Sequence, residues 1–95
     1  MIILHVTYTA KPGEGIARKF VEELEQGPAL NVRAEKGNIC YDYYFNADDS
    51  KVVLLEKWEN EDVLAAHMEM PHMAEIRSIK AKYIADQLLE KFIVS

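Results

Sequence analysis

The chain has 95 residues, which suits one small domain spanning residues 1–95. Its net charge is −5 and its 11 lysines and arginines are scattered, so the composition argues against binding to nucleic acid or to anionic membranes. No segment approaches the roughly 20 apolar residues that span a bilayer, and no charged leader precedes the first strand pattern. We therefore expect a soluble, cytoplasmic protein with no membrane association.

The first half of the chain predicts a strand followed by two helices. Residues 2–9 alternate β-branched and aromatic side chains between two faces, as a strand does, and Lys11-Pro12-Gly13 ends this pattern. A helix is expected at about residues 14–26, where one apolar stripe recurs at helical spacing: Ile16, Ala17, Phe20, Val21 and Leu24. Pro28 suits the start of a short second helix that reaches about Glu35.

The second half predicts a hairpin, a broken helix and a last strand. Residues 39–45 and 52–58 read as strands joined by turn formers, which predicts an antiparallel hairpin. Cys40 is the only cysteine, so no internal disulfide can form, and its aromatic surroundings favour a buried, inert thiol. Asn60 can cap a helix that breaks near Pro71 and continues to about Lys82, and residues 86–94 are expected to form the last strand.

This order of elements, βαββαβ, predicts an α+β, ferredoxin-like antiparallel sheet with helices on one face. The first and third strands carry apolar residues on both faces, for example Ile3 beside Leu4 and Val53 beside Leu54. Helices can cover only one of these faces, and soluble proteins rarely expose a large apolar patch. We therefore expect a homodimer that pairs sheet against sheet.

Two histidines are the first candidates for chemistry. His67 shares a helical stripe with Val63 and Leu64, and His72 shares one with Ile76, so both imidazoles are expected to point toward the sheet. An imidazole changes charge near neutral pH and can act as a base toward a hydroxyl group. The alternative is that both are core histidines hydrogen-bonded to the backbone.

Glu56 and Trp58 lie on one face of the third strand, so they are expected to face the histidines if that face is covered by helices. A buried carboxylate needs a hydrogen-bonding partner, for which a histidine is the obvious candidate. Alternatively, Glu56 sits at the end of the strand and reaches solvent or a neighbouring arginine, Arg33 or Arg77. Trp58 is either core or the wall of a substrate site, and its indole N–H needs an acceptor if it is buried.

Further candidates for a substrate site are His5, Tyr41 and Tyr43. His5 lies on the face of the first strand opposite Leu4, so it lines either the pocket or a subunit contact. Tyr41 and Tyr43 share a face of the second strand and supply hydroxyl groups and aromatic walls.

Metal binding is the alternative use of the two histidines. Five-residue spacing places His67 and His72 about 140° apart on an unbroken helix, unlike the i, i+4 pair of zinc-binding helices. Pro71 could rotate them together, but no further cysteine or carboxylate stands at a convincing spacing. We expect no metal.

The pattern formed by Glu56, Trp58, His67, Pro71 and His72, E-x-W followed by H-x-x-x-P-H, resembles the antibiotic biosynthesis monooxygenase (ABM) family. The resemblance extends to Lys11-Pro12-Gly13, residues 33–38 and residues 55–73. It implies a small molecule bound between sheet and helices, and a homodimer. The oxygenases of this family use no metal or flavin, because a base deprotonates the substrate to an electron-rich anion that reacts with dioxygen.

Carried over to this chain, the resemblance makes His67 or His72 the base, Glu56 an orienting acceptor and Trp58 a wall. The first strand contains no asparagine, which argues against the haem-degrading branch, whereas Gly37-Asn38 and Asp42 look closer to the branch that isomerises a phosphorylated signal. Three hypotheses follow: a cofactor-independent monooxygenase acting on a small quinol, an isomerase of a small phosphorylated carbonyl compound, and a non-catalytic dimeric binding module.

Overall fold

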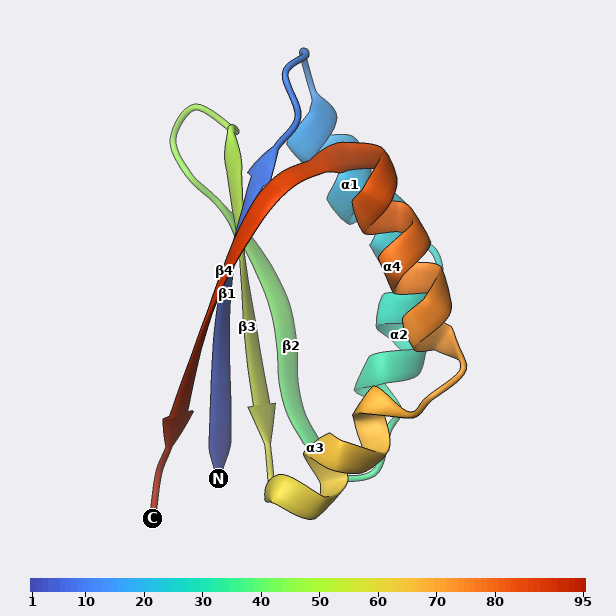
Figure 1. The fold of residues 1–95 in the computed structure, drawn as a ribbon, viewed down its shortest axis with the longest axis vertical. Coiled ribbons are helices and arrows are strands. Elements are labelled where there is room, and N and C mark those ends of the chain that lie inside the picture. Colours follow the sequence, from blue (N-terminus) through green and yellow to red (C-terminus); the bar gives the residue numbers. More distant parts are fainter.

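The computed structural model describes residues 1–95 and contains a four-stranded sheet packed against four helices (Figure 1). In Figure 1 the sheet forms one layer and the helices the other, with α3 at the end where the N-terminus lies. The elements in chain order are β1 (Ile2–Ala10), α1 (Ile16–Glu25), α2 (Pro28–Arg33), β2 (Asn38–Phe45), β3 (Lys51–Trp58), α3 (Glu61–Met68), α4 (His72–Tyr83) and β4 (Ile84–Ile93).

The sheet is antiparallel throughout, with the strand order β2-β3-β1-β4. Glu56 of β3 lies opposite Leu4 of β1 and Tyr41 of β2, and Leu4 lies opposite Lys91 of β4. Directly opposed residues share a face of the sheet. The register therefore places Glu56 and Tyr41 side by side on one face, which confirms the predicted ferredoxin-like α+β fold.

The hydrophobic core lies between this face and the helices. Along β1 and β3, core residues alternate with less buried ones. In α1, the core residues lie on the predicted apolar stripe. Trp58, Phe20 and Leu24 are among the largest side chains that are fully buried. The remaining core residues are Ile2, Leu4, Val6, Tyr8, Ala17, Ala29, Val32, Tyr41, Val52, Leu54, Leu64, Ile76 and Ile79.

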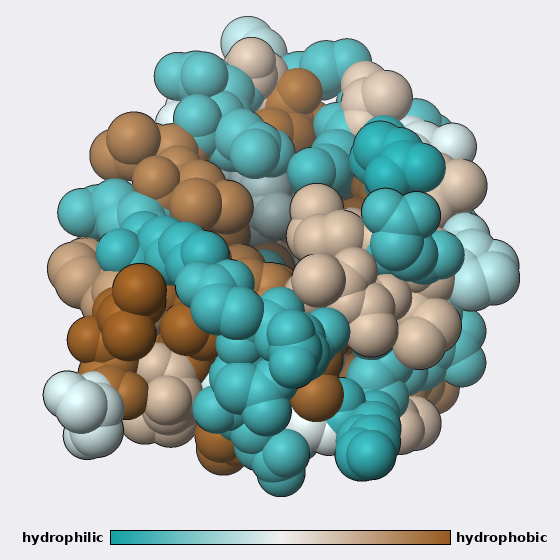
Figure 2. All heavy atoms as spheres, turned by 60° about the horizontal axis from the view of Figure 1, so that its bottom comes forward, coloured by the Kyte–Doolittle hydropathy of each residue, from teal (hydrophilic) through white to brown (hydrophobic).

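The other face of the sheet carries no helix and stays open. On it, Thr7 lies opposite Leu88 and Ile3 lies opposite Phe92, and both residues of β4 are half or more exposed. Figure 2 shows hydrophobic atoms gathered on the left of the molecule, the side that the sheet occupies in Figure 1, with a hydrophilic band across them. We call this surface the open face.

The predicted boundaries agree with the structure to within two residues, and the largest differences are at the start of α1, the end of α2 and the start of β4. The strand was expected from residue 86, but β4 starts at Ile84, directly after Tyr83, with no loop between helix and strand. A register shift next to Ala10 accommodates this sharp change of direction. None of the helices has the length and apolar character needed to cross a bilayer.

Candidate active site

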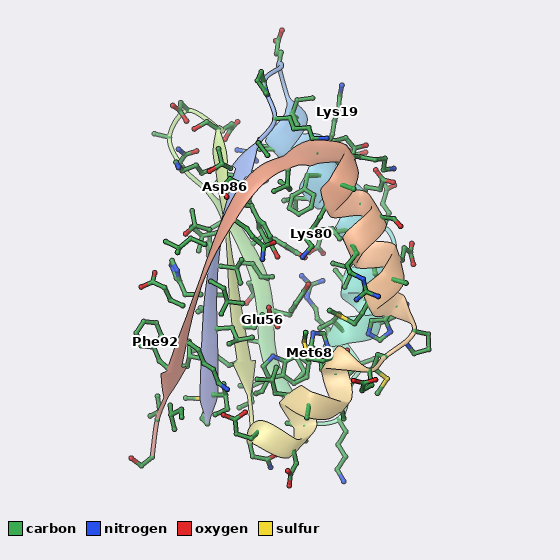
Figure 3. The ribbon with its side chains drawn as sticks, in the orientation of Figure 1. Lys19, Glu56, Met68, Lys80, Asp86 and Phe92 are labelled. Carbon is green, nitrogen blue, oxygen red and sulfur yellow. The ribbon has the colours of Figure 1, made fainter.

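A small cavity of 140 Å³ lies between the sheet and helices α3 and α4. Glu56 and Tyr41 from the sheet and His67 from α3 contribute polar groups to its wall, together with Lys80 from α4. Figure 3 labels Glu56 on the sheet and Lys80 on α4, on the two sides of the space between the layers. The remaining lining residues are mostly apolar: Leu4, Val6, Tyr8, Leu54, Met68, Met73, Ile76, Gln87 and Leu89.

His67 reaches this cavity because of how α3 begins and which side it buries. The side chain of Asn60 caps α3 by accepting a hydrogen bond from the backbone N–H of Val63 at 3.0 Å. This cap fixes where α3 begins, and Leu64 and His67 face the core, as their spacing predicted. The side chain of His67 is only 3% exposed.

The imidazoles of His67 and His72 meet on one carboxylate oxygen. Oε2 of Glu35 lies 2.8 Å from Nδ1 of His67 and 2.7 Å from Nε2 of His72. The side chains of Glu35 and His72 are 5% and 13% exposed. An ionised carboxylate only accepts hydrogen bonds, so both nitrogens donate to Glu35, and in a neutral His67 the nitrogen without a proton is Nε2. We call these three residues the Glu–His–His cluster.

The sequence did not identify Glu35, which lies between α2 and β2. It reaches the histidines because Gly37, two residues on, packs against Val63 so closely that a Cβ at Gly37 would lie 2.7 Å from that side chain. Val63 and His67 are four residues apart on the same side of α3, so the contact that holds the loop also brings Glu35 to His67. The only signal was that Glu35 falls in the segment shared with the ABM family.

Glu56 is buried with two polar neighbours. Its Oε1 accepts a hydrogen bond from Nε1 of Trp58 at 3.1 Å and lies 3.9 Å from Nε2 of His67. Burial raises the pKa of Glu56, and the hydrogen bond from Trp58 only partly opposes this rise. Glu56 is therefore not a surface carboxylate, and Arg33 pairs with Glu25 instead.

Trp58 is a core residue that packs against the site. It is fully buried, its ring centroid lies 4.5 Å from that of His67, and it does not line the cavity. Its expected role as a substrate wall is therefore wrong for this cavity, because the indole is covered by the imidazole and bonded to Glu56.

The tyrosines of β2 form a short hydrogen-bonded pair. Tyr43 donates to the hydroxyl of Tyr41 at 3.1 Å, and burial raises the pKa of both phenols. Both hydroxyls therefore stay protonated. Tyr41 lines the cavity as expected, whereas Tyr43 lies behind it.

His5 lies elsewhere. It is on the open face, 39% exposed, with Nδ1 3.6 Å from Oε1 of Glu90, so it cannot contribute to this cavity. His5 was predicted to line either the pocket or a subunit contact. The structure excludes the pocket, so only a subunit contact on the open face remains. His72 does not line the cavity either, and reaches it only through Glu35 and His67.

The Glu–His–His cluster is also a set of metal ligands, contrary to the expectation that no carboxylate accompanies the histidines. Its three ligand atoms lie within 4.8 Å of one another, and two imidazoles with one carboxylate suit zinc or ferrous iron. Ligands about 2.0–2.1 Å from a tetrahedral ion would, however, be separated by about 3.3 Å. The separations of 2.7 and 2.8 Å are hydrogen-bond lengths, so hydrogen bonds from the imidazoles to the carboxylate fit this geometry better than a bound metal ion does.

Solved structures share this fold over nearly their whole length. A Deinococcus radiodurans protein superimposes with a TM-score of 0.85 at 18% identity, covering 100% of this chain and 93% of that protein. A Nitrosomonas europaea protein superimposes with a TM-score of 0.83 at 24% identity, covering 99% and 98%. At these identities the likeness establishes the fold alone.

Sequence comparison establishes the family. The Bacillus subtilis protein named "Putative monooxygenase YcnE" is 33% identical over 73 residues, covering 76% of this chain and 74% of the relative. The model of the family described as "Antibiotic biosynthesis monooxygenase" matches residues 1–78. Both descriptions name monooxygenase chemistry and neither specifies a substrate. The chain therefore belongs to the antibiotic biosynthesis monooxygenase family.

Proposed function

We propose that this protein is a cofactor-independent monooxygenase that oxidises a small dihydroxy-aromatic compound with dioxygen. The observation that carries the proposal is the orientation of His67. Glu35 holds Nδ1 of this imidazole, so Nε2 faces Glu56, and both residues line the cavity. A histidine whose second nitrogen is held by a buried carboxylate is oriented as a general base.

The cavity supports a substrate with a single ring. Its volume of 140 Å³ is close to that of an engineered apolar cavity of about 150 Å³ that binds benzene. Most of its lining is apolar, so it excludes water from the anion that the base creates. A fused two-ring quinol would not fit without displacing side chains.

In the proposed reaction, Nε2 of His67 removes a proton from one hydroxyl group, and the resulting phenolate reacts with dioxygen. One oxygen atom enters the ring as a carbonyl and the other leaves as water, so dihydroxybenzene and dioxygen give hydroxybenzoquinone and water. The substrate supplies all four electrons. Glu56, whose pKa is raised by burial, can hold a proton beside the reacting oxygen.

Oxygen uptake by chelator-treated protein tests this function, with hydroquinone and catechol as substrates and naphthohydroquinone as the two-ring comparison. We expect single-ring uptake above the rate in buffer, a loss of roughly 100-fold or more in His67→Gln, and no loss in His5→Gln. His5 is the matched control because it lies on the other face of the sheet. Rates equal to buffer for every quinol would reject the proposal.

A second candidate is an isomerase of a small phosphorylated carbonyl compound, with His67 and Glu56 moving protons between adjacent carbons. Lys80 favours it, because this cation lines the cavity and could hold a phosphate group. Solvent-deuterium exchange into a panel of ketose phosphates, followed by NMR under nitrogen, would detect the reaction. Ligand binding with neither activity would instead identify a binding module.

We also propose that the protein is a homodimer joined through the open face. Leu88 is 62% and Phe92 50% exposed on this face, and Nδ1 of His5 is buried there without a hydrogen-bond partner. A second copy would cover the two apolar side chains and could supply the missing partner. Light scattering in solution measures the oligomeric state directly.

A further inference from the structure

A second hollow adjoins the cavity at the junction of α4 and β4. This outer groove has a volume of 380 Å³, and Arg77 and Asp86 are among its lining residues. Lys80 and Gln87 line both the groove and the inner cavity. Nζ of Lys80 donates a hydrogen bond to Oε1 of Gln87 at 3.3 Å, so this pair lies where the two hollows meet.

Arg77 and Lys80 are cations without an ion pair. They lie three residues apart on one side of α4, and no carboxylate oxygen comes within 4.0 Å of either, although Asp86 lines the same groove. Four of the other nine lysines and arginines form ion pairs: Arg18 with Asp49, Arg33 with Glu25, Lys82 with Glu23, and Lys91 with Glu61. Arg77 and Lys80 are distinguished from the other unpaired cations because they line the same groove.

The surroundings of Lys80 favour a negatively charged neighbour. Burial lowers the pKa of Lys80, the positive charge of Arg77 lowers it further, and Glu56 opposes these effects only in part. A bound anion between the two cations would remove their mutual repulsion and accept hydrogen bonds from both. Asp86 weakens this attraction but leaves the groove with one excess positive charge among its lining residues.

We propose that the outer groove binds an anionic group, carboxylate or phosphate, of the same small molecule whose ring occupies the inner cavity, and that Lys80 holds this group. The inference rests on the proposed function in one respect, since both place the ring beside His67. It adds that the substrate is a single-ring acid rather than a neutral quinol. Lys80 then determines specificity, while His67 and Glu56 act on the ring.

Binding measured under nitrogen, without turnover, separates this inference from the proposed oxidation. The probes are benzoate, phenyl phosphate and neutral phenol, titrated by calorimetry into the wild type, Lys80→Met and Lys82→Met. Methionine keeps the apolar stem of lysine and removes the charge. Lys82 is the matched control, because it lies on the same helix and its removal changes the net charge equally.

We expect one of the two anions to bind the wild type at least about tenfold more tightly than phenol, the effect of one charge-assisted hydrogen bond. Lys80→Met should lose that advantage and keep its affinity for phenol, whereas Lys82→Met should keep both. The tighter anion identifies the acid as carboxylate or phosphate. Thermal unfolding checks that Lys80→Met is folded, and Lys80→Gln replaces it if it is not.

Three results would overturn the inference: equal binding of phenol and both anions, equal losses in Lys80→Met and Lys82→Met, or inorganic phosphate binding as tightly as phenyl phosphate. The last would show an anion site that takes no part in binding a ring. Failure of oxygen uptake with these anion affinities intact would reject only the proposed oxidation.

Discussion

Replacing Glu35 by glutamine tests whether the Glu–His–His cluster is held by a buried negative charge. The variant keeps the size and a carbonyl oxygen of the side chain but loses the charge that both imidazoles share. Hydrogen bonds to charged groups contribute about 1.5–3 kcal/mol and neutral ones about 0.5–1.5 kcal/mol. With two such bonds on a side chain that is 5% exposed, we expect unfolding to require about 2–3 kcal/mol less.

Glu25→Gln is the matched control for this change. Glu25 also accepts two hydrogen bonds, from Arg33 at 2.7 and 2.5 Å, but its side chain is 37% exposed. Exposed ion pairs contribute about 0–1 kcal/mol, so the same substitution should cost less than about 1 kcal/mol here. The two variants differ mainly in burial.

Urea unfolding at one protein concentration measures both variants, with fluorescence of Trp58 as the probe. Trp58 is the only tryptophan and stacks on His67, so its emission reports on the cluster itself. For slopes of about 1–2 kcal/mol per molar urea, Glu35→Gln should lower the midpoint by about 1–3 M. A midpoint no lower than that of Glu25→Gln would refute the assignment of a shared, buried charge.

Four further outcomes are expected. Burial raises the pKa of Glu56 above its ordinary value near 4.5, so the wild type should lose stability relative to Glu56→Gln as pH rises above that value. A difference between the two proteins that does not change with pH would contradict this. Gly37→Ala should cost about 3 kcal/mol in urea unfolding, whereas Gly15→Ala, also at positive φ but with open space around it, should cost about 1 kcal/mol. Zinc titrated into the wild type should leave the melting temperature unchanged, because the distances in the Glu–His–His cluster are those of hydrogen bonds rather than of metal ligands. A rise of several degrees would show a metal site. Leu88→Glu should halve the mass measured by light scattering, whereas Leu30→Glu should not, because Leu30 is similarly exposed but lies on α2. Unchanged masses in both variants would reject the open face as the interface.

Much of the fold could be predicted from local sequence patterns. Alternation along residues 2–9 and 52–58 and the stripe that includes Phe20 and Leu24 predicted the strands and the first helix, because each element needs one continuous apolar side. The last strand was less clear, because nearly all of β4 is exposed and its sequence lacks the alternation of a half-buried strand. The overall pattern of elements helped there more than periodicity did.

The candidate site was predictable only for side chains whose direction follows from their own element. His67 faces inward because Leu64 does, and Glu56 faces inward because Leu54 does, so both could be placed from spacing alone. The spacing of Trp58 also placed it inward, but whether it lines the cavity depends on His67 covering it, a contact between two elements.

The spacing of residues along the chain was enough to predict which side chains face the interior, because the periods of helix and strand are properties of the local backbone. Tertiary structure alone decided that Glu35 joins the two histidines and that Lys80 lies between two hollows. Glu35 stands 32 residues before His67, and their contact depends on Gly37 packing against Val63. Such a contact is formed only when the helices pack on the sheet, and no local sequence pattern predicts it.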